Sequence, residues 1–352
     1  MKKKINVLIT AIGGGGHGEQ ILKALRLVGD NRYCIFGADA NPHCPQFNLV
    51  EGHAALPLAS APNYLDRLFE VCENFKIDAL FHGCEPELKL FSQHRETIEA
   101  KGIFLPINPI NVIETCMDKA RTFEFLKAQG IDVPFFTRVS STIELDSVKE
   151  FPVVVKPSLG GGGSADVFIA QSRKELLALG AYLDLDGATR DFLIQEYVGS
   201  PEDEFTVGVL HDMNGLYINS IALRRMLTGQ LNIRSSVPNR TGLRKFGPNL
   251  LISSGVSHGQ IGRFPEVTSQ CCEVARLIGA RGPLNIQCRL VDGKIKIFEI
   301  NPRFSGTTSL RAMVGYNEPD ILMRKHFENE KIEKDFQYKE ATILRSLTEE
   351  IL

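Results

Sequence analysis

Short apolar runs alternate with amphipathic segments through residues 1–105, a pattern typical of strands separated by helices. We expect strands at 5–12, 33–38, 79–82 and 102–105, and helices at 63–74 and 85–101. A glycine-rich run, 13–18, follows the first strand and precedes a helical pattern. This βαβ opening predicts a small doubly wound α/β sheet. Pro106 and Pro109 then place a boundary near residue 108.

The next helical pattern begins with a capping residue, followed by a lysine at a position that is unfavourable for a positive charge. Asp118 is suited to cap a helix that ends at Gly130, and Lys119 lies in the first turn of that helix. A cation there is disfavoured by the helix dipole. A ligand charge that compensates Lys119 would explain its position, and a solvated lysine would explain it equally well.

The segment 151–158, FPVVVKPS, is a strongly apolar strand with a lysine inside it. Because burying Lys156 unpaired is costly, we expect an anionic partner beside it. Four residues of the run that follows, Gly161, Gly162, Gly163 and Ser164, precede a further strand at 167–170. Glycines between two strands predict a flap whose N–H groups can wrap phosphate oxygens. No G-x-x-x-x-G-K-[ST] motif occurs, so this is not a Walker loop.

A strand at 192–198, FLIQEYV, carries a candidate nucleotide contact at its end. Backbone groups after Glu196 are placed to read an adenine edge, and Glu204 is placed to accept ribose hydroxyls. Taken alone, either acid would be interpreted as a surface charge.

The segment 284–306 predicts a hairpin that ends in a metal site. Apolar side chains alternate on both sides of a turn at Asp292-Gly293, at positions Ile286, Cys288, Leu290, Ile295 and Ile297. Glu299 continues the face of the last two isoleucines, and Asn301 leaves the same side of the strand. A carboxylate and an amide oxygen suit Mg²⁺ better than zinc.

Two neighbours complete this predicted site. Gln287 would add a third oxygen if the loop has three residues with Gly293 left-handed, because a two-residue turn would place Gln287 opposite the Glu299 face. Arg303 is a planar donor suited to a phosphate or a carboxylate. An edge hairpin with a solvated acid and amide is the alternative, and the close spacing of Glu, Asn, Pro and Arg favours the site.

Composition narrows the class of protein. With 352 residues the chain should form two or three lobes, and 43% apolar with 23% charged residues is ordinary for a globular protein. A net charge of −2 argues against a nucleic-acid or membrane surface, and no apolar run reaches the roughly 20 residues of a membrane span. The eight cysteines contain no C-x-x-C pair, which favours free thiols in a reducing, cytoplasmic compartment.

Two further regions are candidates for substrate contacts. Gly14, Gly15 and His17 belong to the first glycine loop, which could press on a substrate in a neighbouring lobe. The segment 221–262 is rich in Arg, Ser and Gly, and we expect Arg225, Arg234 and His258 in it to contact an anionic substrate or the nucleotide. A solvated basic face is the alternative. Asp39 keeps a nicotinamide site open, because it lies near the distance at which an acid holds a ribose.

In order and combination, these motifs resemble the ATP-grasp superfamily, and most nearly the synthetase halves of the carbamoyl-phosphate synthase large subunit and related carboxylate–amine ligases. The motifs that carry the resemblance are Lys119, Lys156 with its flap, Gln195-Glu196-Tyr197-Val198, Glu204, Gln287 and Glu299-x-Asn301-Pro302-Arg303. The resemblance implies a Rossmann-like lobe at 1–108, an ATP-grasp central lobe at 109–195 and a C-terminal lobe with the metal site at 196–352.

The resemblance also implies a role for each motif. Lys119, Lys156 and the flap would hold the ATP phosphates, Glu196 and the Val198 backbone the adenine, and Glu204 the ribose. Gln287, Glu299 and Asn301 would bind two Mg²⁺ ions, with Mn²⁺ able to substitute. Arg303, with Lys156, would steady the transferred phosphoryl group. An insertion at Ser200-Pro201-Glu202-Asp203 and the presence of one such module depart from carbamoyl-phosphate synthase, so carbamoyl phosphate is not the expected product.

The implied activity is an ATP- and Mg²⁺-dependent ligase that joins a small-molecule carboxylate to an amine through an acyl phosphate. A homodimer is the implied assembly, because dimers are common in that family. Two other classes remain open at this point: a nucleotide-binding sensor without turnover, and a nicotinamide-dependent oxidoreductase that uses the first glycine loop.

Overall fold

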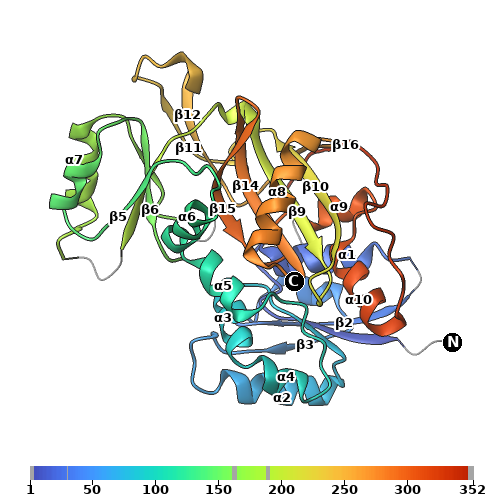
Figure 1. Cartoon of the computed structure of the whole chain (residues 1–352). Helices are drawn as coiled ribbons and strands as arrows, with labels where there is room; N and C mark the ends of the chain where they lie inside the picture. Colours follow the sequence, from blue (N-terminus) through green and yellow to red (C-terminus); the bar gives the residue numbers. More distant parts are fainter. Residues whose placement is uncertain (1–3, 30, 161–164, 188–190, 348–352) are drawn as a thin grey trace.

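Three main sheets follow one another along the chain (Figure 1). The computed structural model describes residues 4–29, 31–160, 165–187 and 191–347. The expected flap residues Gly161, Gly162, Gly163 and Ser164 lie outside the described residues.

The N-terminal lobe is a parallel four-stranded sheet in the order β3-β2-β1-β4. Val7, Leu8 and Ile9 of its central strand are fully buried, because helices cover both faces of a parallel sheet. The expected helix at 85–101 is interrupted at His94, and the expected strand at 102–105 makes only an isolated bridge to β4. The elements are β1 (Ile5–Ile9), α1 (His17–Arg26), β2 (Tyr33–Asp39), η1 (Pro45–Leu49), β3 (Gly52–Ala55), α2 (Tyr64–Phe75), β4 (Ala79–Phe81), α3 (Glu85–Gln93), α4 (Arg95–Glu99) and α5 (Ile110–Met117).

The central lobe is a small antiparallel sheet in the order β5-β8-β6-β7. The predicted cap of its first helix is confirmed, since the Asp118 carboxylate accepts the N–H groups of Ala120 and Arg121. The elements are α6 (Lys119–Ala128), β5 (Phe136–Val139), η2 (Ile143–Ser147), β6 (Val153–Pro157), β7 (Phe168–Ala170), α7 (Arg173–Tyr182) and β8 (Phe192–Glu196).

The C-terminal lobe is built on an antiparallel six-stranded sheet in the order β15-β14-β9-β10-β13-β16, with a separate hairpin, β11-β12. Helix α8 covers one face of the sheet, where Val274 packs with Ile286 and Ile297 in one apolar cluster. The opposite face carries the polar side chains of the site. The elements are η4 (Pro201–Asp203), β9 (Glu204–His211), β10 (Tyr217–Arg225), β11 (Ile233–Pro238), η5 (Arg244–Phe246), β12 (Asn249–Ser253), β13 (Gly259–Gly262), α8 (Pro265–Ile278), β14 (Pro283–Val291), β15 (Lys294–Asn301), α9 (Thr308–Met313), α10 (Glu318–Glu328) and β16 (Ala341–Ile343).

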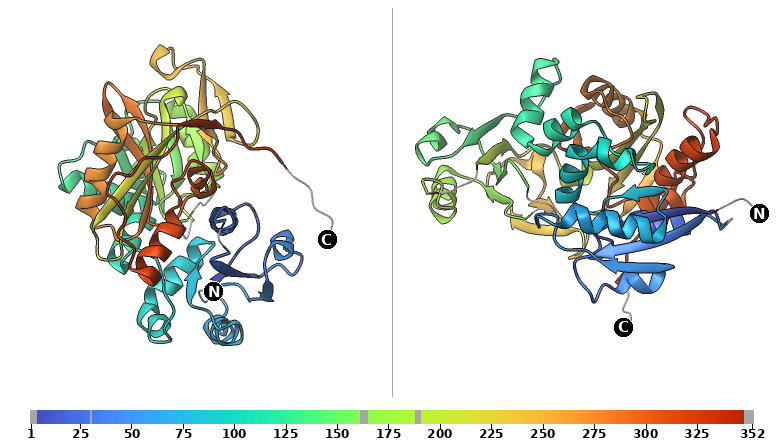
Figure 2. Two further views of the ribbon diagram at one scale, coloured as in Figure 1. Left: turned by 90° about the vertical axis from the view of Figure 1, so that its right-hand side faces the viewer. Right: turned by 90° about the horizontal axis from the view of Figure 1, so that it is seen from below.

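The N-terminal and C-terminal lobes share a core. Helix α1 lies against α9 and α10 (Figure 2), and Leu25 belongs to the same buried cluster as Leu310 and Leu322. Asn108, fully buried, donates to the carbonyls of Pro283 and Pro302. The first lobe is thereby fixed against the strand that carries the predicted metal site.

The hairpin at 283–301 corrects the expected turn. Val291 pairs directly with Lys294, and Asp292 (φ 49°) and Gly293 (φ 75°) form a two-residue left-handed turn, so the three-residue loop was wrong. A β-bulge supplies the missing residue instead. Cys288 pairs with Ile297 and Gln287 pairs with Glu299, which leaves Phe298 unpaired.

The bulge decides which face Glu299 occupies. Ile297 is fully buried beneath α8, whereas Glu299 turns to the opposite face and lies beside Gln287. The expectation that Glu299 continues the isoleucine face was therefore wrong. The three predicted metal ligands nevertheless share one side of the sheet, because Asn301 follows Glu299 by two residues.

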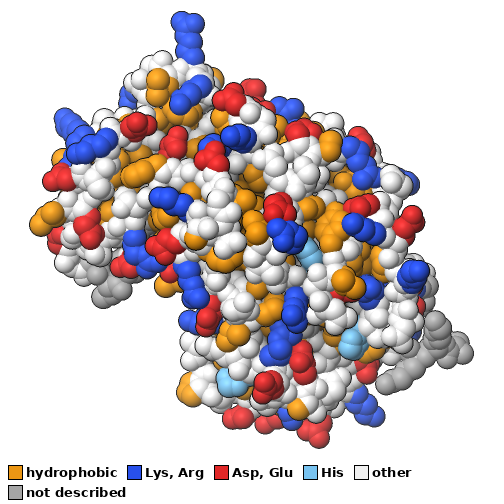
Figure 3. Space-filling view, in the orientation of Figure 1, with side chains coloured by type: hydrophobic (Ala, Val, Ile, Leu, Met, Phe, Trp, Pro, Cys, Tyr) orange, Lys and Arg blue, Asp and Glu red, His pale blue; other side chains and the backbone are white. Residues whose placement is uncertain are grey.

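The surface carries charges of both signs (Figure 3), and the cysteines form no disulfides among the described residues. Acidic and basic side chains are interspersed over the face seen in Figure 3. All eight cysteines are free thiols, as predicted. None of the helices in the described ranges combines the length and the apolar character needed to cross a bilayer.

Candidate active site

Seven of the predicted site residues line one cavity between the central and C-terminal lobes: Lys119, Lys156, Glu196, Val198, Glu204, Gln287 and Glu299. It has about 690 Å³ of open space. Its polar lining is formed by Lys119, Lys156, Gln195, Glu196, Glu204, Ser253, Gln287, Arg289 and Glu299. Val154, Val167, Leu251, Ile252 and Phe298 add apolar walls beside these charged groups.

Two lysines approach the cavity from the central lobe. Lys156, on β6, is buried, and its Nζ donates to the carbonyl of Phe298 at 2.8 Å. The β-bulge thus gives Lys156 an acceptor in the neighbouring lobe. Burial lowers the Lys156 pKa to about 7, and the charge of Lys119 acts in the same direction while Glu299 opposes it. Lys119 Nζ donates to the carbonyl of Gly160 at 2.8 Å, where the expected flap begins.

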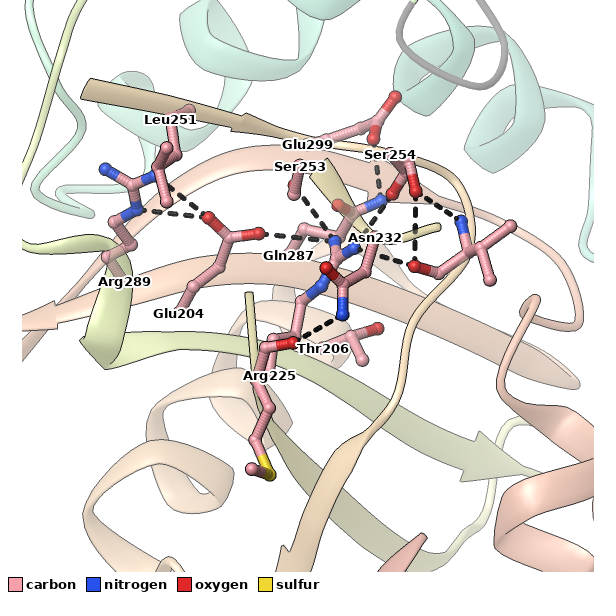
Figure 4. A network of polar contacts seen from close by, with 12 residues as sticks. Glu204, Thr206, Arg225, Asn232, Leu251, Ser253, Ser254, Gln287, Arg289 and Glu299 are labelled. Carbon is pink, nitrogen blue, oxygen red and sulfur yellow. Dashed lines mark hydrogen bonds and ion pairs between the residues drawn. The ribbon is translucent and has the colours of Figure 1, made fainter. Parts of the chain in front are cut away.

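The opposite end of the cavity carries a buried charge cluster. Glu204 lies between the guanidinium groups of Arg289 and Arg225, at 3.0 and 3.2 Å (Figure 4). Burial opposes ionisation of Glu204, but the two arginines outweigh it and hold its pKa below the ordinary value. Glu204 Oε1 is buried and accepts no hydrogen bond from the described residues.

The predicted adenine contact lies next to this cluster. Tyr197 and Val198, which follow β8, both line the cavity. The Glu196 carboxylate accepts the Phe135 N–H at 3.3 Å, so its side chain supports β5. In the backbone of 196–198, the N–H groups of Glu196 and Tyr197 donate to the carbonyls of Phe135 and Pro152.

The predicted metal ligands form a set of oxygen donors. Gln287 Nε2 donates to Glu299 Oε2 at 2.7 Å, and half a turn of the amide would present its oxygen to a cation instead. Asn301 is 5% exposed, and its Nδ2 has no hydrogen-bond partner among the described residues. One carboxylate and two amide oxygens fit a hard cation such as Mg²⁺. No cluster of three or more His, Cys, Asp and Glu side chains occurs in the described ranges, so any metal there needs the amides.

A smaller cavity of about 310 Å³ continues the site toward the N-terminal lobe. It is lined by Lys119, Glu299 and Asn301, and by Glu85 and Arg303. Arg303 Nη2 lies 3.3 Å from Glu85 and 3.2 Å from Asn301 Oδ1, while its Nε is buried without a partner among the described residues. A charged donor with an unused N–H thus lines the smaller cavity, which shares Lys119 and Glu299 with the larger one.

Comparison with known proteins fits this geometry. Residues 253–349 match the family described as "ATP-grasp in the biosynthetic pathway with Ter operon", and residues 7–106 match "PylC-like, N-terminal domain". An L-amino acid ligase structure from Bacillus licheniformis has a TM-score of 0.64 at 18% identity, and the match covers 95% of this chain and 78% of that one. The chain has the ATP-grasp fold. The predicted fold, a Rossmann-like lobe followed by a two-lobed ATP-grasp fold, is confirmed.

Two further proteins are similar over most of this chain. The carbamoyl phosphate synthase large chain of Thermoplasma acidophilum is 26% identical over 258 residues, which are 71% of this chain and 23% of that relative. The chain therefore spans about a quarter of that relative's length. N5-carboxyaminoimidazole synthetase from Staphylococcus aureus, complexed with ADP, has a TM-score of 0.62 at 15% identity, covering 91% of this chain and 78% of that one.

His17, which follows the N-terminal glycine loop, lies close enough to Arg303 of the smaller cavity to be affected by its charge. Gly14 and Gly15 are exposed at positive φ, and His17 begins α1 with its Nε2 3.2 Å from His82 Nδ1. Burial, with the charge of Arg303, lowers the pKa of His17 well below its ordinary value and that of His82 to about 3. Both imidazoles are therefore neutral at pH 7.

Asp39, the acid at the end of β2, is hydrogen-bonded to the same loop. Asp39 accepts the N–H groups of Gly13 and Asn41 at 2.9 and 2.8 Å. Each carboxylate oxygen thus accepts a backbone N–H group. A ribose hydroxyl would have to compete with these hydrogen bonds to bind Asp39.

The remaining predicted substrate residues do not form one group. Arg225 is buried and donates to Ser253 Oγ and the Ser254 carbonyl, in addition to its ion pair with Glu204. His258 contacts Asn232 Nδ2 through one ring nitrogen and accepts the Arg345 N–H through the other. Arg234, on β11, is exposed. Substrate contact by these three residues stays a prediction.

Sequence reasoning missed Arg289 and Glu85. Arg289 follows Gln287 by two residues and so shares its face of β14, a signal that period two alone could have given. Glu85 is adjacent in space to Arg303 but 218 residues away in sequence, and no local pattern points to it.

Proposed function

We propose that this ATP-grasp protein is an ATP- and Mg²⁺-dependent ligase. It activates a small-molecule carboxylate as an acyl phosphate and joins it to an amine, releasing ADP and phosphate. The observation that carries the proposal is that two lysines, Gln287 and Glu299 line the same cavity as residues 196–198, with Asn301 in the adjoining smaller cavity.

The cavity suits ATP along its whole length. The backbone of 196–198 would take the adenine. The buried Glu204 Oε1, which pairs with Arg225 but has no hydrogen bond from the described residues, would accept a ribose hydroxyl. Lys156 and Lys119 would hold the phosphates, and a phosphate oxygen would give the buried Lys156 ammonium its missing counter-charge.

Gln287, Glu299 and Asn301 would hold two Mg²⁺ ions, with Mn²⁺ as a substitute. When bound, these ions supply charge neutralisation on the transferred phosphoryl group. In this assignment Glu299 would supply the single carboxylate among the three ligands.

The chain's own residues would then position and stabilise the reacting groups. A substrate carboxylate oxygen bonds to the γ-phosphorus as the bond to the ADP oxygen breaks, and Lys156, Lys119 and Arg303 stabilise the charge that develops. The amine nitrogen next attacks the acyl carbon, phosphate leaves, and the nitrogen loses a proton. No side-chain nucleophile is required.

The decisive test is ADP release with MgATP and a mixed library of carboxylates and amines. Glu299→Gln keeps the size of the side chain and its bond to Gln287 but removes the only carboxylate of the donor set. We expect ADP release to fall at least about 100-fold. The exposed acid Glu273 provides the control variant Glu273→Gln, which should leave release unchanged.

The outcomes separate the candidate functions. Release that needs both substrates supports the ligase. Release that needs only the acid, with a hydroxamate trapped by hydroxylamine, supports acyl phosphate formation without the true amine. ATP binding with no release across the library would contradict a ligase and favour a sensor. Light scattering during chromatography would test the proposed homodimer.

A further inference from the structure

Arg289 makes an unusual number of contacts for a residue beside a nucleotide cavity. It is 5% exposed, and its Nε and Nη2 donate to Glu204 Oε2 at 3.1 and 3.0 Å. Nη1 donates to the carbonyls of Val198 and Gly199 at 3.0 and 3.3 Å, and Nη2 also donates to Leu251 at 3.3 Å. A guanidinium has five N–H groups, so every donor is used within the protein.

These contacts join three segments that line the same cavity. Val198 belongs to the segment after β8, Glu204 begins β9 and Leu251 lies on β12. The guanidinium also lies 4.7 Å from the ring centre of Tyr197, whose hydroxyl accepts the Leu251 N–H. Arg289 thus fixes the backbone after β8 relative to both neighbouring strands.

Close packing at Gly199 limits how else the segment after β8 could be arranged. Gly199 has φ +56°, and a Cβ there would lie 2.7 Å from Val291 and 3.6 Å from Arg289. Arg289 also occupies Glu204 Oε2, while Oε1 pairs with Arg225 at 3.2 Å (Figure 4). One side chain therefore orients both the adenine edge and the ribose acceptor.

We propose that Arg289 is a positioning residue that sets adenine-nucleotide affinity and selectivity. The proposal rests on the proposed function, because it assigns ATP to this cavity. Arg289 has no free donor for ATP itself. Through the Val198 carbonyl it holds the backbone after β8, and it also holds the Glu204 carboxylate. Both would then lie where the adenosine contacts them. Lysine cannot replace it, since an ammonium has three donors and lacks the planar fork.

The test is nucleotide binding to the full chain, measured by calorimetry with MgATP and MgGTP, together with the KM for ATP and kcat. For Arg289→Lys we expect ATP affinity to fall at least about tenfold and the preference for ATP over GTP to fall at least about fivefold. At saturating ATP, kcat should stay within about threefold, because the reacting end of the cavity is unchanged. Arg276→Lys, at an exposed ion pair with Glu273, is the matched control.

A second variant guards against misfolding. Arg289→Met removes every donor of Arg289, while Glu204 keeps its buried ion pair with Arg225 and is not left without a counter-charge. This variant should also lose the preference for ATP over GTP. An unchanged ATP/GTP ratio in either variant would overturn the proposal, as would equal losses for both nucleotides accompanied by a lower melting temperature. If the wild type binds no ATP, the proposed function fails first and this inference falls with it.

Discussion

The buried lysine of β6 gives the sharpest quantitative prediction. With a pKa of about 7 in the ligand-free protein, Lys156 is about one-tenth protonated at pH 8. A polyphosphate beside it favours the charged form and raises its pKa by 2 units or more, on the order expected for an adjacent anion. Binding ATP should therefore take up about 0.8–0.9 proton at pH 8 and about 0.1 at pH 6.

The sign of the pH dependence follows from the same shift. Because the bound form holds the extra proton, ATP affinity should weaken as pH rises above 7, by just under about tenfold per unit at the steepest. Stability without ligand runs in the opposite direction. The folded pKa lies below the unfolded value of 10.5, so this group makes unfolding harder as pH rises between the two values.

The assay is isothermal titration calorimetry at pH 8 in HEPES and in Tris, whose ionisation enthalpies differ, with ATP in the absence of divalent ions. The difference in apparent enthalpy gives the number of protons taken up. Lys156→Arg keeps the cation but cannot lose its proton, so its uptake should be close to zero. Lys127→Arg, exposed on α6, should behave as wild type. Equal uptake in wild type and Lys156→Arg, or larger uptake at pH 6 than at pH 8, would refute the reasoning.

Two further predictions concern the supports of the site. Gly83→Ala places a Cβ 2.2 Å from the Thr10 carbonyl and 2.3 Å from that of Ala11, so the free energy of unfolding should fall by about 2–3 kcal/mol or more in urea denaturation. Gly29→Ala, with open space around it, is the control, and equal values for the two variants would contradict the packing. Asp118→Ala should lower it by about 1–2 kcal/mol, because α6 loses its cap. Burial raises the pKa of Asp118, but the hydrogen bond from Ser158 and other contacts outweigh it, so the pKa lies below its ordinary value. The difference in unfolding free energy from wild type should therefore shrink as pH falls through that lowered value. A pH-independent difference would count against the assignment.

Local chemistry was sufficient for several parts of this protein. The βαβ opening, the cap at Asp118 and the lysine inside an apolar strand could all be predicted, because each depends on neighbouring residues in the chain. The Asp292-Gly293 pair likewise specifies a tight turn, since both residues tolerate positive φ. The order of motifs was enough to indicate the ATP-grasp fold, because each motif belongs to one strand or loop of it.

The sequence determined which residue types the site contains, and the tertiary structure decided which of them face one another. A period of two predicts a strand's faces only while the ladder is regular, so the bulge at Phe298, which turns Glu299 toward Gln287, was not visible in the pattern. The pairing of Glu204 with Arg225 and Arg289 and of Arg303 with Glu85 joins residues from different strands and lobes. Such contacts depend on how the sheets pack, because burial makes a charged group pair with the opposite charge that the fold places beside it.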